Sequence, residues 1–161
     1  MTTDITAPST GFTGLEEVLN YPLSVGRIVY PDGDEYDEGV ALWNSRNKRR
    51  PSALVQVQGV EDIRSVVRYA RENELPFTIR AGGHEVDGRA LQDGVLAIDL
   101  NRHNGVFVDR ARKRVVVQSG ARLRKLDRET QAHGLGLTAG TVSDTGVAGL
   151  TLGGAVRSDG G

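Results

Sequence analysis

Two arginines, two adjacent glycines and one histidine occur together at residues 80–89, in the order Arg-Ala-Gly-Gly-His-Glu-Val-Asp-Gly-Arg. Gly82 and Gly83 carry no Cβ, so their backbone N–H groups can turn toward an anion at close range. The arginines at the two ends of the segment can neutralise a phosphate. The segment is therefore a candidate site for a phosphorylated ligand. The alternative is an ordinary Gly-Gly turn between two strands, with His84 merely exposed.

A second glycine-rich segment lies at residues 134–154 and combines small residues with hydroxyl groups. Such a composition fits a wall from which a ligand excludes bulky side chains, and the alternative is a flexible glycine-rich tail. The segment begins with Gly134-Leu-Gly-Leu-Thr-Ala, which has glycines spaced as in a dinucleotide fingerprint. Because these glycines follow a predicted helix and not a strand, we reject a Rossmann site here.

The elements that position these segments follow from hydrophobic spacing. Residues 53–58 and 77–80 are predicted strands, and residues 60–70 between them carry apolar residues at helical intervals. Strand, helix and strand within about thirty residues form a βαβ unit, which predicts a parallel pair with a right-handed crossover. The first candidate segment begins where the second of these strands ends.

The remaining pattern predicts an α+β fold, a mixed sheet with flanking helices, in a chain of 161 residues that is long enough for one domain. The further predicted elements are a turn at 30–34, a short helix at 35–43, a strand at 95–100, a hairpin of 105–109 with 114–118, and a helix at 122–133 that Gly134 ends.

Composition excludes several classes of function. The formal net charge of −1 argues against a nucleic-acid binder, and the basic run at 46–50 is interpreted as a solvated turn. The absence of cysteine excludes disulfides and thiolate sites, and the three scattered histidines predict no metal site. No apolar run approaches the length of about 18 residues that spans a membrane, and residues 1–10 lack a signal-peptide pattern. We therefore expect no membrane association and a cytoplasmic protein.

In combination, the motifs resemble the flavin domain of FAD-linked oxidases of the p-cresol methylhydroxylase/vanillyl-alcohol oxidase superfamily, and within it the berberine-bridge-enzyme-like oxidases. The segments that carry the resemblance, in chain order, are Gly26–Pro31, Tyr36-Asp37, Trp43-Asn44, Arg50-Pro51, Phe77–Gly88, Ile98–Leu100 and Gly134–Gly154. The resemblance implies an FAD-binding domain of the p-cresol methylhydroxylase (PCMH) type, represented by its first subdomain and part of the second.

The resemblance also implies FAD as the cofactor. Gly82, Gly83 and His84 fall on the Gly-Gly-His whose amides wrap the FAD pyrophosphate. His84 matches the histidine that many members bond covalently to the flavin 8α-methyl group. Val142 stands where bicovalent members have a cysteine, so attachment is expected through His84 alone. The full set of implied cofactor-binding residues is Arg80, Ala81, Gly82, Gly83, His84, Glu85, Gly88, Gly140, Thr141, Val142, Thr145, Gly146, Gly149 and Gly153.

The sequence departs from the family pattern in three places. Glu85 replaces a small polar residue and is expected either to point away from the pyrophosphate or to pair with Arg89. The residues after Gly154 diverge, and the chain ends where family members continue into a substrate domain. We expect a disordered stretch at 1–14, a partial FAD-binding domain at 15–156 and a divergent tail at 157–161, without a substrate domain or catalytic residues, as in a truncated gene product.

The resulting functional expectation is the FAD-binding portion of an oxidoreductase that oxidises a small organic substrate by hydride transfer to flavin. The alternative is a non-catalytic remnant or interaction module of the same fold, which self-associates through an exposed core. A noncovalent flavin reductase of the same superfamily is a further alternative, against which the His84 motif argues.

Overall fold

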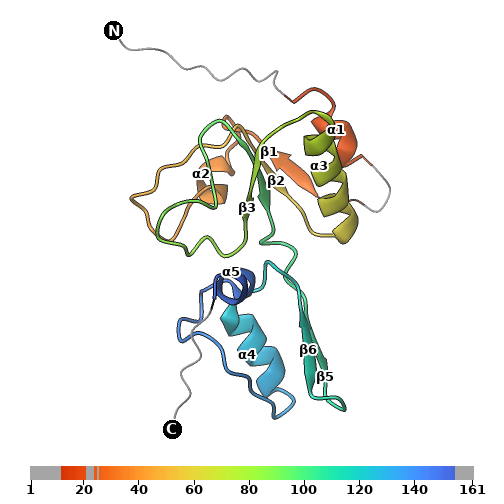
Figure 1. The fold of residues 1–161 in the computed structure, drawn as a ribbon, viewed down its shortest axis with the longest axis vertical. Coiled ribbons are helices and arrows are strands. Elements are labelled where there is room, and N and C mark those ends of the chain that lie inside the picture. The colour runs from red at the N-terminus through yellow and green to blue at the C-terminus, as the bar shows by residue number, and fades with distance from the viewer. Residues whose placement is uncertain (1–11, 21–23, 25, 155–161) are drawn as a thin grey trace.

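The computed structural model describes residues 12–20, 24 and 26–154, which form two lobes (Figure 1). The upper lobe contains a four-stranded sheet with helices on both sides, and the lower lobe contains two helices beside a two-stranded hairpin. Residues 1–11 and 155–161 lie outside the described residues, so the tail expected at 157–161 and most of the disordered stretch expected at 1–14 have no structural account. Residues 12–14 form the turn before the first helix.

The sheet of the upper lobe is mixed and has the strand order β1-β2-β4-β3. β1 (Arg27–Val29) runs antiparallel to β2 (Ala53–Gln56), while β2 and β3 (Phe77–Arg80) both run parallel to β4 (Leu96–Asp99). The βαβ unit predicted from sequence therefore has two parallel strands that do not pair with each other, because β4 lies between them. All four residues of β4 are buried, as the central position of a sheet covered on both faces requires.

Alternate residues of the sheet face two separate hydrophobic clusters. Val55 and Ile98 pack on the side of α1 (Leu15–Val18) and α3 (Val60–Glu72), whereas Leu54 and Ala97 pack on the side of α2 (Tyr36–Gly39). The period of two along each strand produces this division. Helices thus cover both faces of the sheet, with one hydrophobic cluster on each face.

The start of α3 is fixed by a buried carboxylate. Asp62 Oδ2 accepts hydrogen bonds of 2.9 Å from the backbone N–H groups of Gln58 and Gly59, which lie at the N-terminal end of the helix. These donors would otherwise be unpaired, and a negative charge there also complements the helix dipole. α3 consequently begins at Val60, as its apolar spacing predicts.

The lower lobe begins after a close crossing of the chain. A Cβ on Gly120 would lie 1.7 Å from the backbone oxygen of Leu100, so only glycine allows the connection to pass there. The hairpin of β5 (Val106–Asp109) and β6 (Arg114–Val117) and the helix α4 (Leu123–Gln131) follow the sequence prediction closely. Gly134, with φ of +66°, lies just beyond α4.

A further helix, α5 (Val147–Leu152), lies in the glycine-rich segment and was not predicted. Its sequence, Val-Ala-Gly-Leu-Thr-Leu, contains a glycine and has no clear polar face, so hydrophobic spacing gives no helical signal. Figure 1 shows that α5 lies directly below the loop that follows β3, between the two lobes. The helix therefore brings the second candidate segment to the first.

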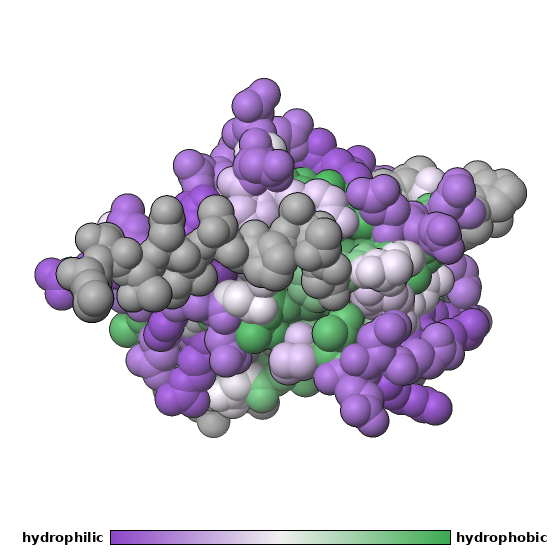
Figure 2. Space-filling view, turned by 90° about the horizontal axis from the view of Figure 1, so that it is seen from above, coloured by the Kyte–Doolittle hydropathy of each residue, from purple (hydrophilic) through white to green (hydrophobic). Residues whose placement is uncertain are grey.

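The surface seen from above in Figure 2 is largely hydrophilic, with apolar residues gathered near its centre. Among the described residues, no helix has both the length and the apolar character required to cross a lipid bilayer.

Candidate functional site

A cleft of about 680 Å³ lies between the loop that follows β3 and helix α5. Both glycine-rich segments singled out in the sequence line this cleft, although about sixty residues separate them. The lining residues are Ile79, Ala81, Gly82, Gly83, His84, Glu85, Arg89, Ala90, Leu100, Ser119, Thr145, Gly146, Ala148, Gly149, Leu150 and Leu152.

The two segments meet backbone to backbone at Gly82 and Gly146. A Cβ on Gly82 would lie 2.6 Å from the backbone nitrogen of Gly146, and a Cβ on Gly146 would lie 2.8 Å from the nitrogen of Gly82. Both distances are shorter than real Cβ contacts allow, so the approach requires glycine on each side. One end of the cleft is therefore made of main chain alone.

The loop after β3 depends on glycine at two more positions. Gly83 has φ of +63° and Gly88 has φ of +73°, in the region that L-residues with a Cβ rarely adopt. A Cβ on Gly88 would also lie 2.7 Å from the side-chain Cγ of Asn47. Within the described part of the chain, the backbone N–H groups of Gly83 and His84 have no hydrogen-bond acceptor. Free amides beside a glycine turn are the donors that an anionic group needs.

The segment that follows α2 holds this loop in place. The backbone N–H of Trp43 donates to Gly83 O at 2.9 Å, and the Trp43 indole stacks on the His84 imidazole. The side-chain amides of Asn44 and Asn47 donate to Val86 O at 2.9 and 2.8 Å. Although Trp43-Asn44 is one of the motifs behind the family resemblance, neither residue was predicted to belong to the site.

Arg80 supports the loop from beneath. Its side chain is buried, with Nη1 donating to Asp99 Oδ1 at 3.1 Å and Nη2 donating to Ala41 O at 2.9 Å. A Cβ on Gly83 would lie 3.4 Å from Arg80 Nε, so the guanidinium lies directly under the turn. Because Asp99 neutralises the charge of Arg80 within the core, this arginine supports the loop and is not one of the groups that line the cleft.

The acidic residue in the loop has a local partner. Glu85 Oε1 accepts a hydrogen bond from the backbone N–H of Ala90 at 3.0 Å, which closes the turn between the two residues. Arg89 forms an ion pair with Asp87 at 3.3 Å and not with Glu85, so the pairing considered from the sequence does not occur. The Glu85 carboxylate is thereby used in shaping the loop.

Several residues of the second segment lie away from the cleft lining. Thr145, Gly146 and Gly149 line the cleft, whereas Gly140, Thr141, Val142 and Gly153 do not. Gly140 packs against other side chains: a Cβ there would lie 2.8 Å from Leu150 Cδ2. The structure thus brings together the residues around Gly82 and Gly146 and leaves the stretch at 140–142 exposed beside them.

Asp144, which precedes the lining residue Thr145, pairs with Arg122 at 2.6 Å and also with Arg124. Burial alone would raise the pKa of Asp144, but the hydrogen bond and charge of Arg122 and the charges of Arg124 and His84 together lower it. The carboxylate therefore stays ionised next to two guanidinium groups, and the local charge is positive.

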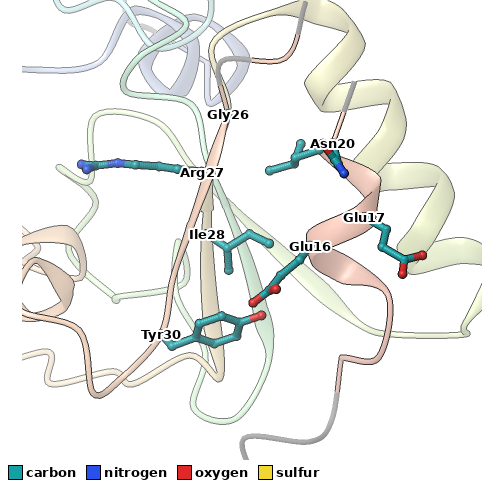
Figure 3. A pocket seen from close by; sticks show the side chains of 8 residues that line it. Glu16, Glu17, Asn20, Gly26, Arg27, Ile28 and Tyr30 are labelled. Atoms are coloured by element: carbon teal, nitrogen blue, oxygen red, sulfur yellow. The ribbon is translucent and has the colours of Figure 1, made fainter. Parts of the chain in front are cut away.

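A second pocket, of about 550 Å³, lies between α1 and β1 (Figure 3). Glu16 points toward the Tyr30 hydroxyl there, while the Arg27 side chain extends away from α1. Burial and, after it, the charge of Glu16 raise the pKa of Tyr30. None of the residues predicted to bind a cofactor lines this pocket. Among the described residues there is also no group of three His, Asp or Glu side chains that could hold a metal ion.

The class of protein follows from the fold and the glycine-lined cleft together with the comparisons. Residues 51–160 match the FAD binding domain family, and the chain belongs to this family. The predicted PCMH-type α+β fold and the resemblance to berberine-bridge-enzyme-like oxidases are thereby confirmed, with FAD as the cofactor.

The particular relatives include an FAD-linked oxidoreductase. The chain is 36% identical over 131 residues to the FAD-linked oxidoreductase YgaK of Bacillus subtilis (strain 168), covering 81% of this chain and 29% of YgaK. Among solved structures, 6-hydroxy-D-nicotine oxidase from Arthrobacter nicotinovorans superimposes with a TM-score of 0.75 at 33% identity, over 82% of this chain and 29% of that one. The Physcomitrella patens BBE-like 1 protein gives 0.76 at 28% identity, over 86% and 30%. The chain thus spans about 30% of the length of these proteins.

Proposed function

We propose that FAD binds in the cleft between the β3 loop and α5, with its pyrophosphate against the turn at Gly82, Gly83 and His84. The single observation that carries this proposal is the cleft itself, which two glycine-rich segments distant in sequence line together. An anion at this turn would meet the free N–H groups of Gly83 and His84. The buried Arg80 would keep the turn in shape without contacting the ligand.

The residues of the cleft fit such a ligand on three counts. The contact of Gly82 with Gly146 leaves main chain only where a side chain would obstruct a dinucleotide. Ile79, Leu100 and Leu150 supply apolar surface for an aromatic ring system. Next to the lining residue Thr145, the two guanidinium groups of Arg122 and Arg124 exceed the single charge of Asp144 and so favour an anionic ligand.

We further propose that the chain is the flavin-holding part of an oxidoreductase that acts on a small organic substrate. When bound, the flavin supplies a hydride acceptor. The chain's own residues hold the cofactor, exclude water from one face of it with Ile79 and Leu150, and provide His84 as the attachment point. No residue of the chain is assigned a role as catalytic base.

Attachment through His84 would join an imidazole nitrogen to the carbon of the flavin 8α-methyl group. One N–H bond of His84 and one C–H bond of the methyl group would be broken, and the two hydrogens, with their electrons, would pass to dioxygen to give hydrogen peroxide. The position of His84 in the cleft lining, directly after the glycine turn, supports this proposal.

The test is direct. The purified 161-residue chain is incubated with FAD in air, separated from free FAD and precipitated with acid, and flavin fluorescence is measured in pellet and supernatant. We expect flavin in the pellet of the wild type and of the control His133→Ala, whose histidine is exposed at the end of α4. We expect His84→Ala to release all of its flavin into the supernatant. A wild type that binds no FAD at all would overturn the proposal.

A second candidate function is an interaction module, and the exposed apolar side chains favour it. Leu152 is 88% exposed, Val116 67% and Ile79 55%, and all three lie on edges or ends of elements. Exposed apolar surface of this kind favours association with another copy. Light scattering after size-exclusion chromatography, with and without FAD, tests it: a monomer at all concentrations would exclude self-association.

A further inference from the structure

We propose that Trp43 is a positioning residue that holds the His84 imidazole in the orientation needed for bond formation with flavin. This inference rests on the proposed attachment through His84 and adds to it a residue that stacks on the imidazole but does not line the cleft. Four observations on the described residues carry it.

The first observation is the ring contact. The centroids of the Trp43 and His84 rings are 4.7 Å apart and their planes differ by 19°, which is a stacked arrangement. A stack restricts rotation of the imidazole about its Cβ–Cγ bond, because turning the ring out of plane would drive its edge into the indole face. The plane in which the imidazole nitrogens lie is therefore set by Trp43.

The second observation is that no hydrogen bond fixes the orientation of the imidazole. His84 Nε2 is buried without a partner, and neither ring nitrogen forms a hydrogen bond with any of the described residues. A histidine whose orientation is fixed by hydrogen bonding normally has one nitrogen paired with a carbonyl or carboxylate. In its absence, the stack on Trp43 is the interaction that defines the ring plane.

The third observation is that the backbone of Trp43 is tied to the same loop. Residues 41–43, here termed the strap, contact the end of β3 and the loop that follows it. Ala41 O accepts a hydrogen bond from Arg80, and a Cβ on Gly83 would lie 3.3 Å from Leu42 Cδ2. Trp43 N–H donates to Gly83 O at 2.9 Å. The indole therefore moves with the loop that carries His84 and keeps its distance from the imidazole.

The fourth observation is the exposure of the indole. Trp43 is 62% exposed, although burying a tryptophan would gain more free energy than burying almost any other residue. One face of its ring is turned to His84 in the stacked arrangement. The stack on His84 is the aromatic contact that this exposed indole makes among the described residues.

The test compares three variants of the full chain. Trp43→Leu removes the stacking face, Trp43→Phe retains an aromatic face, and Phe107→Leu is the matched control, an exposed aromatic on β5 that does not line the cleft. The initial rate of acid-stable flavin incorporation is measured at saturating FAD, together with noncovalent FAD affinity in the His84→Ala background. We expect Trp43→Leu to incorporate flavin about twofold to tenfold more slowly, the range that aromatic pairing predicts. Trp43→Phe is expected to stay close to the wild type, and the control to match it.

A spectroscopic readout separates positioning from general stability. The indole ring current shifts the His84 ring-proton resonances in the FAD-free protein, and we expect Trp43→Leu to abolish that shift while its circular dichroism stays that of the wild type. Equal incorporation rates for Trp43→Leu and the wild type would overturn the inference. So would a loss of noncovalent affinity that accounts for the slower rate, since Trp43 would then be a binding residue. A wild type that binds FAD but never incorporates it would instead refute the attachment and, with it, this role for Trp43.

Discussion

Replacement of Gly82 by alanine would force apart the two segments that form the cleft. The added Cβ would lie 2.6 Å from the backbone nitrogen and 2.7 Å from the Cα of Gly146, and no side-chain rotation can relieve a contact between main-chain atoms. To reach an ordinary separation of 3.4 Å, the segments must move apart by about 0.8 Å. Overpacking of this kind costs about 1–3 kcal/mol of folding stability.

The same displacement would act on the cofactor, because the turn at Gly83 and His84 moves with Gly82. If about 1.4 kcal/mol of this strain remains in the complex with FAD, the affinity for FAD falls about tenfold. Urea unfolding measures the change in the free energy of unfolding. FAD titration gives the affinity, and Trp43 is a convenient reporter since it is the single tryptophan of the sequence and stacks beside the cleft.

Gly136→Ala serves as the control for Gly82→Ala. Gly136 also belongs to a glycine-rich loop, but a Cβ there has no heavy atom within 4 Å. We expect its urea midpoint and FAD affinity to match the wild type. The reasoning would be refuted if Gly82→Ala were as stable as Gly136→Ala and bound FAD equally well, because the close contact with Gly146 would then not constrain the site.

Three further predictions concern other parts of the molecule. Arg80→Met should lower the free energy of unfolding by about 3–5 kcal/mol in urea titrations, because it leaves the carboxylate of Asp99 buried without its ion-pair partner; a loss below 1 kcal/mol would contradict this. Gly149→Ala should raise the thermal midpoint, because alanine stabilises the interior of α5 by about 0.5–1 kcal/mol relative to glycine and its Cβ meets no atom within 4 Å. The same variant should bind FAD more weakly if the cofactor fills the cleft. Burial raises the pKa of Tyr36 from 10.0 to about 12, so its hydroxyl contributes stability that is fully present below pH 10 and is lost as the pH rises toward about 12; alkaline titration of stability should show this loss in the wild type and not in Tyr36→Phe.

The strands β2 to β6, the helices α3 and α4 and the loop of the site could be predicted because their signals are local, whereas α1 and β1 were not predicted. The apolar spacing that begins at Val60 gives the start of α3, which continues two residues past the predicted end to Glu72, and the run 77–80 gives β3 at both of its ends. The order of the strands in the sheet, by contrast, could not be predicted from local signals. β4, whose residues are all buried, lies between β2 and β3. This central position depends on the packing of helices on both faces of the sheet.

The candidate site likewise contains residues that local sequence predicts and residues that only the tertiary packing brings to it. The turn at Gly82 and Gly83 is recognisable in sequence because adjacent glycines permit backbone conformations and contacts that other residues do not. Trp43 could not be assigned to the site from its sequence position, forty-one residues before His84, since only the packing of the strap against the loop brings the rings to 4.7 Å. Asn44 and Asn47 were missed for the same reason.

By itself, the sequence determined the family, the cofactor and the glycine turn, because these depend on residue types in a fixed local order. Only the tertiary structure decided which of the predicted residues share one cleft. It showed that Gly146 meets Gly82 main chain to main chain, that Arg80 turns into the core toward Asp99, and that the stretch at 140–142 lies outside the cleft lining. The physical reason is that a cleft is formed by contacts between segments distant in the chain, and those contacts are set by how the two lobes pack and not by any one segment.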